Sequence, residues 1–431
     1  MNYLEEKLGI NFKEEIKKCI NVAELSTIEF ERFSLEYDKL SEYNACILYL
    51  CKLVSEFAKI NNELILYRGL IYNSYIAYLL GITTINPMDK EYFLYPELAF
   101  GLDGKLPLAM QINVSKSFKN VLIGYLRAIL NGNFYLYEKR SYRYLILLEE
   151  KLDLVYEKNG FHYLMEEKNN YLDDDKVLIV DISYLRQLDG LNELIRKNGY
   201  PKEDIYNDKE IEKLFSLNLN AGLPSGGAPT YRKNVDYSSY ISLIAAWHGS
   251  NTYNQIYDIS KTDCNYFKEY PTSRDMLMTY LINSGIDRKL SYEITRFVRL
   301  GRSMREEQKE TWDSYYSILK KHIDEKILDY LTGIEYMFFL GLSIAFCQID
   351  YLTQYYKVKD PEFYKIMCGD IKKYYSHQNI IVDGDLTIDG NLIEDYDEYC
   401  YALVSEEHRR NEEYFLSDSI ESFDEVDDSP F

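Results

Sequence analysis

Residues 67–87 of this chain read YRGLIYNSYIAYLLGITTINP, and the short apolar run ELILY ends at the first of them. The polar residues INN precede that run and RG follows it, which predicts a strand over 63–67 and then a turn. The next residues predict a helix from about Asn73 to Leu80, ended by Gly81.

A turn that leads from a strand into a helix can hold a phosphate group. It does so when glycines let the backbone come close and the first helical N–H groups point at the anion. Larger residues fill most of the turn here: Leu70, Ile71, Tyr72 and Asn73. The stretch therefore raises the question of whether a nucleotide site is still open.

The surrounding sequence predicts a small sheet and many helices. Apolar residues at helical spacing predict an amphipathic helix over 45–58, just before the opening stretch. The runs LAMQINV (108–114) and KVLIVDIS (176–183) predict two strands, and IIVDGDLTIDGNLI (380–393) predicts a hairpin. From Leu185 onward the pattern is almost wholly helical, so the predicted fold class is α+β and predominantly helical.

Composition limits the classes of function. The 431 residues carry a formal net charge of -21, which repels polyanions unless basic residues are clustered. Seven cysteines without a CxxC pair predict neither a disulfide framework nor a zinc site. The sequence offers no signal-peptide pattern and no apolar run of membrane-spanning length. We therefore expect a cytoplasmic protein that does not associate with membranes.

The motifs resemble those of bacterial C-family replicative DNA polymerases, especially the PolC type. Arg68, Gly69 and Ser74 in the opening stretch match the start of the family's palm, and the match implies that they are nucleotide-binding positions. RDMLMTYLINSGIDRKLSYEITRFVRLGR (274–302) resembles its fingers, and residues 334–367 resemble a later segment. The resemblance implies a small palm-like sheet with a helical fingers-like domain.

The resemblance also suggests how the chain is divided. It implies an N-terminal helical segment (1–34), a palm-like domain with a shortened thumb-like insertion (35–185) and a helical fingers-like domain (186–370). A hairpin and an acidic C-terminal tail (371–431) follow.

The chain departs from the family where catalysis is expected. Two of three family carboxylates should lie on the strand PLAMQINVS, where Ala109 and Gln111 stand instead; Asp181 keeps the third position. Two-metal phosphoryl transfer needs several hard anionic oxygens. One carboxylate cannot hold two metals, so a structural role for Asp181, as a strand-end carboxylate that accepts backbone hydrogen bonds, is favoured over metal binding.

The chain also has fewer of the cationic side chains that would bind phosphate groups. The resemblance implies a lysine and a histidine where Leu340 and Leu342 stand. Apolar side chains offer no counter-charge to a triphosphate. We therefore expect no metal site and no cofactor, with Mg²⁺ needed only if the chain is an active polymerase.

The last ten residues, SFDEVDDSPF (422–431), resemble the acidic C-terminal tip of bacterial single-stranded DNA-binding protein. Such a peptide docks its terminal aromatic ring in an apolar pocket and its acids on a basic rim. The implied partner-binding residues are Asp424, Glu425, Asp427, Asp428, Pro430 and Phe431. An ordinary acidic tail is the equally open alternative.

Three hypotheses of function follow. The preferred one is a catalytically degenerate polymerase relative that binds replication or repair proteins which read the tip, with DNA as a further candidate partner. The second is a divergent active DNA polymerase whose metals are held by Asp173, Asp174 or Asp175 near Asp181. The third is a modulator of host replication, from a mobile element or a defence system, that acts through the tail.

Overall fold

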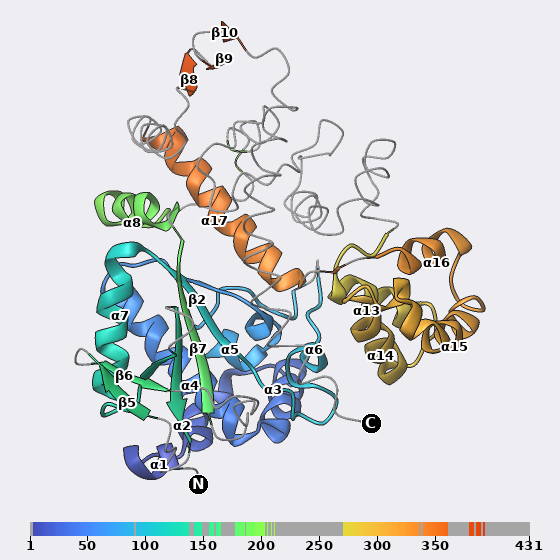
Figure 1. Cartoon of the computed structure of the whole chain (residues 1–431), viewed down its shortest axis with the longest axis horizontal. Helices are drawn as coiled ribbons and strands as arrows, with labels where there is room; N and C mark the ends of the chain where they lie inside the picture. The colour runs from blue at the N-terminus through green and yellow to red at the C-terminus, as the bar shows by residue number, and fades with distance from the viewer. Residues whose placement is uncertain are drawn as a thin grey trace.

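The protein is α+β and mostly helical, as the sequence predicts. The computed structural model describes residues 3–89, 92–137, 142–148, 155–158, 161–164, 177–185, 187–202, 205, 208, 211, 270–334, 336–337, 339–360, 379–382, 385–388 and 391–392. Figure 1 shows the N-terminal helices next to the sheet, with α13 to α16, from the segment after residue 270, as a separate group.

The N-terminal helices begin at polar caps. Ser26 and Glu29 form a reciprocal capping box at the start of one helix, and the Ser41 side chain accepts from Asn44 N–H at the start of the next. The first of these helices continues past residue 34, the predicted end of the N-terminal segment, and the second confirms the helix expected over 45–58. The elements are α1 (Tyr3–Leu8), α2 (Phe12–Cys19), η1 (Val22–Glu24), α3 (Thr27–Lys39) and α4 (Glu42–Ile60).

The opening stretch is more broken than predicted. The strand expected over 63–67 is reduced to β1 (Leu66–Tyr67), and the helix expected over 73–80 is present as α5 (Tyr75–Leu79). A short 3-10 helix that was not predicted, η2 (Leu70–Asn73), precedes it. The break lies at Ser74, whose extended backbone lets its side chain cap α5.

A mixed seven-stranded sheet forms the centre, in the order β1-β2-β7-β4-β3-β6-β5. The two strands predicted over 108–114 and 176–183 are present near its middle, and they pair in parallel. Four further strands, β3 to β6, lie between residues 135 and 164, where the sequence analysis predicted none. Besides β1, the strands are β2 (Met110–Val114), β3 (Tyr135–Tyr137), β4 (Arg143–Leu147), β5 (Val155–Lys158), β6 (Phe161–Leu164) and β7 (Val177–Tyr184).

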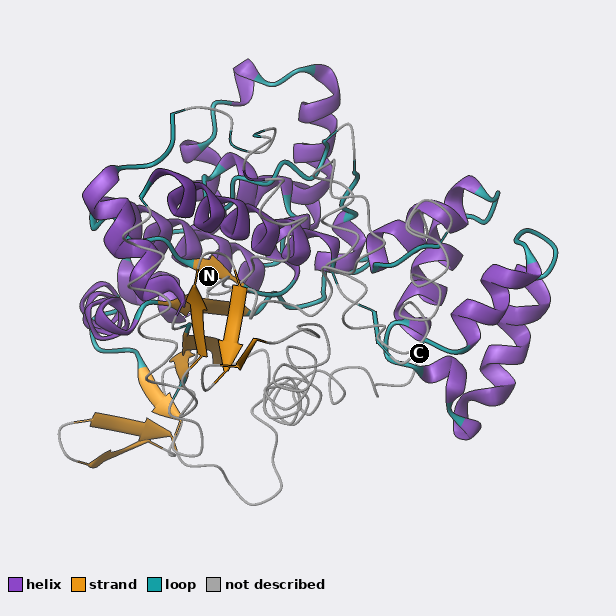
Figure 2. Cartoon of the chain, turned by 90° about the horizontal axis from the view of Figure 1, so that it is seen from above, coloured by secondary structure: helices purple, strands orange, loops and turns teal. Residues whose placement is uncertain are grey.

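One face of the central strands is apolar. Met110, Ile112 and Val114 alternate along β2 with polar residues, and all three are fully buried. Helix α7 (Lys116–Ile129) follows β2 directly and contacts β7 and α4, with the Phe57 and Tyr125 rings stacked 3.9 Å apart. Figure 2 shows the helices gathered along one side of the strands.

The regular elements described between residues 187 and 359 are all helices, as predicted. Helices α13 to α16 form the group at the right of Figure 1, and the long α17 begins beside η2. The elements are α6 (Pro96–Phe100), α8 (Gln187–Asn198), α13 (Arg274–Asn283), α14 (Arg288–Val298), η3 (Arg302–Met304), η4 (Glu306–Gln308), α15 (Lys309–Leu319), α16 (Glu325–Thr332) and α17 (Leu340–Lys359).

The predicted hairpin is confirmed and has a third strand. β8 (Asn379–Val382) pairs antiparallel with β9 (Asp385–Ile388), which pairs antiparallel with β10 (Asn391–Leu392). Throughout the described ranges, each helix is too short or too polar to cross a membrane.

Candidate functional site

A row of polar side chains crosses the centre of the sheet. Gln111 on β2 lies opposite Asp181 on β7, and Asp181 lies opposite Arg143 on β4. Residues in register on neighbouring strands point to the same face, so the three side chains lie side by side. This face is opposite the one that carries Met110, Ile112 and Val114.

Asp181 is paired with Arg143 through two hydrogen bonds. Arg143 Nε donates to Asp181 Oδ1 at 2.9 Å, and Nη2 donates to Oδ2 at 3.1 Å. The residues are 2% and 8% exposed, so the pair is almost fully withdrawn from water. Two parallel bonds between planar groups are the strongest geometry available to this ion pair. Asp181 is therefore neutralised by a guanidinium on the adjacent strand, and not by the backbone donors that the sequence analysis favoured.

Of the two neutral residues of the motif, Gln111 lies beside Asp181 in the sheet. Gln111 Nε2 donates to Asp181 Oδ2 at 3.4 Å, while Ala109 comes directly before β2. Among the described residues no three His, Cys, Asp or Glu side chains gather as metal ligands. A divalent cation at Asp181 would have to displace Arg143, and it would then be held by one carboxylate. Mg²⁺ and similar cations prefer several anionic oxygen ligands.

Arg68 and Gly69 are beside this row. The Arg68 backbone N–H donates to the Gln111 carbonyl at 2.9 Å, and Arg68 Nη2 donates to Ser183 Oγ at 3.4 Å. Gly69 has a φ of +83°, which explains why glycine stands here. Of the predicted nucleotide-binding residues, Arg68 and Gly69 lie next to Gln111 of this row, and Ser74 belongs elsewhere.

Ser74 belongs to a different cluster, at the start of α5. Glu36 on α3 accepts from Tyr75 N–H at 2.9 Å, from Ile76 N–H at 3.2 Å and from Ser74 Oγ at 3.0 Å. Arg32 Nε donates to Glu36 at 2.6 Å. The backbone donors that could meet a phosphate are thus already used by an internal carboxylate.

The larger residues of the turn pack into the core. Ile71, Tyr72, Tyr75 and Ile76 are each less than 5% exposed. Tyr72 Oη donates to the Tyr67 carbonyl at 2.6 Å, and burial raises the pKa of this phenol, so it keeps its proton. The stretch that resembles a phosphate turn is filled by its own side chains.

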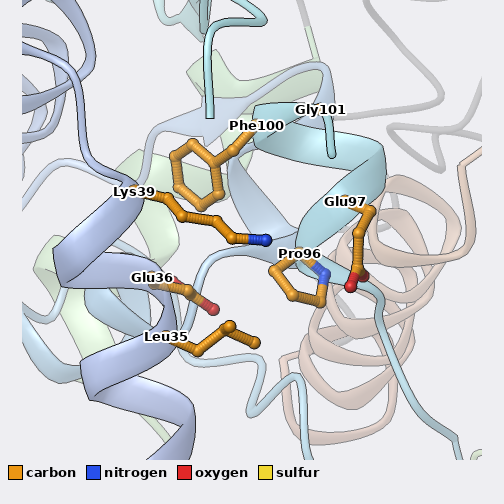
Figure 3. A pocket seen from close by; sticks show the side chains of 7 residues that line it. All are labelled: Leu35, Glu36, Lys39, Pro96, Glu97, Phe100 and Gly101. Carbon is orange, nitrogen blue, oxygen red and sulfur yellow. The ribbon is translucent and has the colours of Figure 1, made fainter. Parts of the chain in front are cut away.

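A small hollow between α3 and α6 offers no alternative ligand site. It has room for about 10 Å³, roughly one water molecule. Figure 3 shows the Lys39 amine between the two helices. The lining residues are Leu35, Glu36, Lys39, Pro96, Glu97, Phe100 and Gly101.

The two leucines that stand for phosphate-gripping residues lie in the first turn of α17. Leu340 is 5% exposed and Leu342 is 7% exposed, so both contribute to the core. The Leu340 backbone N–H donates to the Asp275 carboxylate at 3.2 Å.

Sequence analysis missed Arg143 and Glu36. Arg143 opens the apolar run RYLIL, and an arginine at the start of a buried strand requires an acidic partner. Arg32 and Glu36 lie four residues apart on the buried side of α3, where the helical pattern calls for apolar residues. Charged residues at core positions were the signal in both cases.

Several predicted residues lie outside the described residues. They are the alternative metal ligands Asp173, Asp174 and Asp175, and the tail residues Asp424, Glu425, Asp427, Asp428, Pro430 and Phe431. Their roles stay predictions from the sequence.

Comparison with known proteins gives a partial relationship. No protein-family model matches the chain. Over 175 residues, or 39% of the chain, it is 28% identical to a DNA polymerase III PolC-type from Caldanaerobacter subterraneus subsp. tengcongensis. Over 185 residues, or 38% of the chain, it is 23% identical to a DNA polymerase III PolC-type from Staphylococcus aureus. The match spans only 12% of the length of each relative, so the relationship is DNA polymerase III-like over part of the chain.

Proposed function

We propose that this chain is a catalytically degenerate relative of PolC-type DNA polymerase III that acts in DNA replication or repair by binding, without polymerising DNA. In this proposal the central strands correspond to the palm and the helices after residue 270 to the fingers. The partial similarity to PolC-type polymerases supports the relationship. The main observation that supports a loss of catalysis is the ion pair between Asp181 and Arg143.

The chemical argument rests on charge. Two-metal catalysis needs carboxylates that bridge and neutralise the cations while charge builds up on the transferred group. Here the acids implied by the resemblance are replaced by Ala109 and Gln111, and Asp181 already has a cationic partner. Glu36 supplies a second obstacle, because its carboxylate would repel a triphosphate at the start of α5.

Primer extension on a primed template tests this proposal. The intact chain is assayed with Mg²⁺ and separately with Mn²⁺, beside Asp181→Asn, which keeps the shape of the side chain, and the control Asp103→Asn. We expect no extension from any of the three proteins. Extension that disappears only in Asp181→Asn, with circular dichroism showing an intact fold, would support the divergent polymerase instead.

The partner is proposed from sequence alone. We propose that residues 422–431 compete with the single-stranded DNA-binding protein tip for the replication and repair proteins that read it. Calorimetric titration of such a purified protein with the intact chain, and with a chain lacking Pro430 and Phe431, tests this. Loss of binding in the shortened chain is expected, and equal affinities would leave the tail as a solubilising segment.

A further inference from the structure

Helix α3 carries alternating apolar and acidic residues on its outer side. Ile28, Glu31, Leu35 and Asp38 follow one another at spacings of three and four residues, which places them along one side of the helix. All four are exposed, and Ile28 and Leu35 are 71% and 39% exposed. We call these four residues the α3 stripe.

The α3 stripe is not the side of the helix that packs into the core. Phe33 and Glu36 are buried on the other side, where Glu36 accepts from the Tyr75 N–H at the start of α5. The solvent-facing side of a surface helix normally carries polar residues. Burial within the chain therefore does not explain the two large aliphatic side chains of the α3 stripe.

Phe93 extends this apolar surface. The Arg32 guanidinium lies 5.2 Å from the centre of the Phe93 ring, and Arg32 is four residues after Ile28 and three before Leu35. The Tyr95 ring contacts the Phe93 ring edge-on, with 4.9 Å between their centres. Phe93 is still 37% exposed. An exposed ring whose orientation is already restricted loses little conformational entropy when a partner covers it.

The surface continues to the hollow between α3 and α6. Leu35 lines this hollow together with Pro96 and Phe100 (Figure 3). The Lys39 amine between the two helices donates to the Leu102 carbonyl at 3.0 Å, so its position is restrained. The hollow itself is too small for a side chain, but its apolar edge lengthens the surface that a partner helix can cover.

The charges on this side of α3 indicate the chemistry of the partner. Within the part of the chain that the structure describes, neither Glu31 nor Asp38 forms an ion pair, and the neighbouring Arg32 is buried against Glu36. Carboxylates beside aliphatic residues attract lysine or arginine side chains that are themselves placed beside apolar residues. The same carboxylates repel the phosphates of DNA, anionic lipids and the α3 stripe of a second copy.

We propose that the α3 stripe and Phe93 form a docking surface for a cationic amphipathic helix of a partner protein. The apolar side of that helix covers Ile28, Leu35 and Phe93, and its basic residues pair with Glu31 and Asp38. None of these residues belongs to the segment 422–431, so the inference does not depend on the function proposed above.

Fluorescence anisotropy of the full chain with a labelled synthetic peptide tests the docking surface. The probe is a peptide of leucine and lysine in a helical amphipathic pattern, and the control has the same composition in scrambled order. The control is needed because a net charge of -21 attracts any cationic peptide. We expect the patterned peptide to bind about tenfold more tightly than the scrambled one.

Substitutions of the apolar residues locate the binding. Ile28→Ser and Leu35→Ser should each weaken binding of the patterned peptide about tenfold, because each removes an apolar contact from the surface. The matched control is Ile60→Ser, which removes an aliphatic side chain that is 79% exposed at the end of α4. This control should bind as the wild type does.

Substitutions of the acids test the charge argument. Glu31→Gln combined with Asp38→Asn should weaken binding roughly fivefold at low salt. Glu310→Gln combined with Asp313→Asn removes the same charge from exposed positions on α15, and this variant should bind as the wild type does.

Three outcomes would overturn the docking surface. They are equal affinities for the patterned and scrambled peptides, equal losses in Ile60→Ser and Leu35→Ser, and equal losses in the two charge variants. Self-association of the wild type in sedimentation equilibrium, abolished by Leu35→Ser, would assign the surface to a second copy instead. The comparison of the two peptides needs only the wild-type chain, so the proposal can be refuted even if a variant fails to fold.

Discussion

Replacing Arg143 with leucine is the most informative perturbation of the candidate site. The change removes the two hydrogen bonds, 2.9 and 3.1 Å long, that neutralise Asp181. The Asp181 side chain is 3% exposed, so water cannot take over the role of the guanidinium. An uncompensated buried charge costs about 3–5 kcal/mol, a large part of the stability of a typical domain.

A double-mutant cycle separates the pair from the packing. Arg143→Leu with Asp181→Leu removes both charges, and such a replacement is often neutral or stabilising by about 1–4 kcal/mol. The double variant should therefore unfold at a higher urea concentration than Arg143→Leu alone. The coupling free energy from the four proteins should be roughly 3 kcal/mol.

The assay is urea unfolding monitored by circular dichroism, with and without millimolar Mg²⁺. We expect Mg²⁺ to leave the wild-type midpoint unchanged, since Asp181 already has its cation in Arg143. A cost of less than about 1 kcal/mol for Arg143→Leu would refute the argument from buried charge. Specific stabilisation of the wild type by Mg²⁺, lost in Asp181→Asn, would refute the claim that a guanidinium has replaced the metal.

Two further substitutions, each with a matched control, test the packing around the opening stretch, and urea unfolding measures all four variants. A Cβ on Gly341 would lie 2.4 Å from the Tyr72 Cβ, so Gly341→Ala should cost about 1–3 kcal/mol by forcing α17 away. Gly124→Ala in α7 meets nothing within 4 Å and should be neutral or slightly stabilising; equal effects would contradict the close contact. Glu36→Gln should cost about 3 kcal/mol because an amide cannot accept every bond that the carboxylate accepts. The exposed Glu31→Gln on the same helix should change stability by less than about 0.5 kcal/mol, and similar losses in both would count against the Glu36 cluster.

Periodicity predicted the parts of the fold that carry a strong local signal. The alternation along MQINV and the apolar run VLIVDISY located β2 and β7, and the helical spacing of 45–58 located α4. The strands β3 to β6 are short and rich in tyrosine, and they pair with partners that only the tertiary fold supplies. Their alternation was therefore too weak to separate them from loops.

The candidate site was predictable only in part. The resemblance to the polymerase motifs assigned Gln111 and Asp181 to one site, and the two residues lie opposite each other in parallel register. Arg143 comes from a strand that was not predicted, 38 residues before its partner. The motif showed which carboxylates were absent, but it gave no sign that a guanidinium would pair with Asp181.

The Asp181–Arg143 pair also bears on how such a chain could change over generations. Substituting Arg143 alone leaves the buried Asp181 carboxylate without a counter-charge, so its desolvation is no longer offset. Substituting Ala109 or Gln111 by aspartate first adds negative charge beside a single guanidinium. If the chain is the degenerate polymerase proposed above, a return to metal-dependent chemistry would pass through intermediates less stable than either end point. Under the proposed function, single substitutions of either partner would therefore be selected against for stability alone, and only a simultaneous loss of both charges would release the pair.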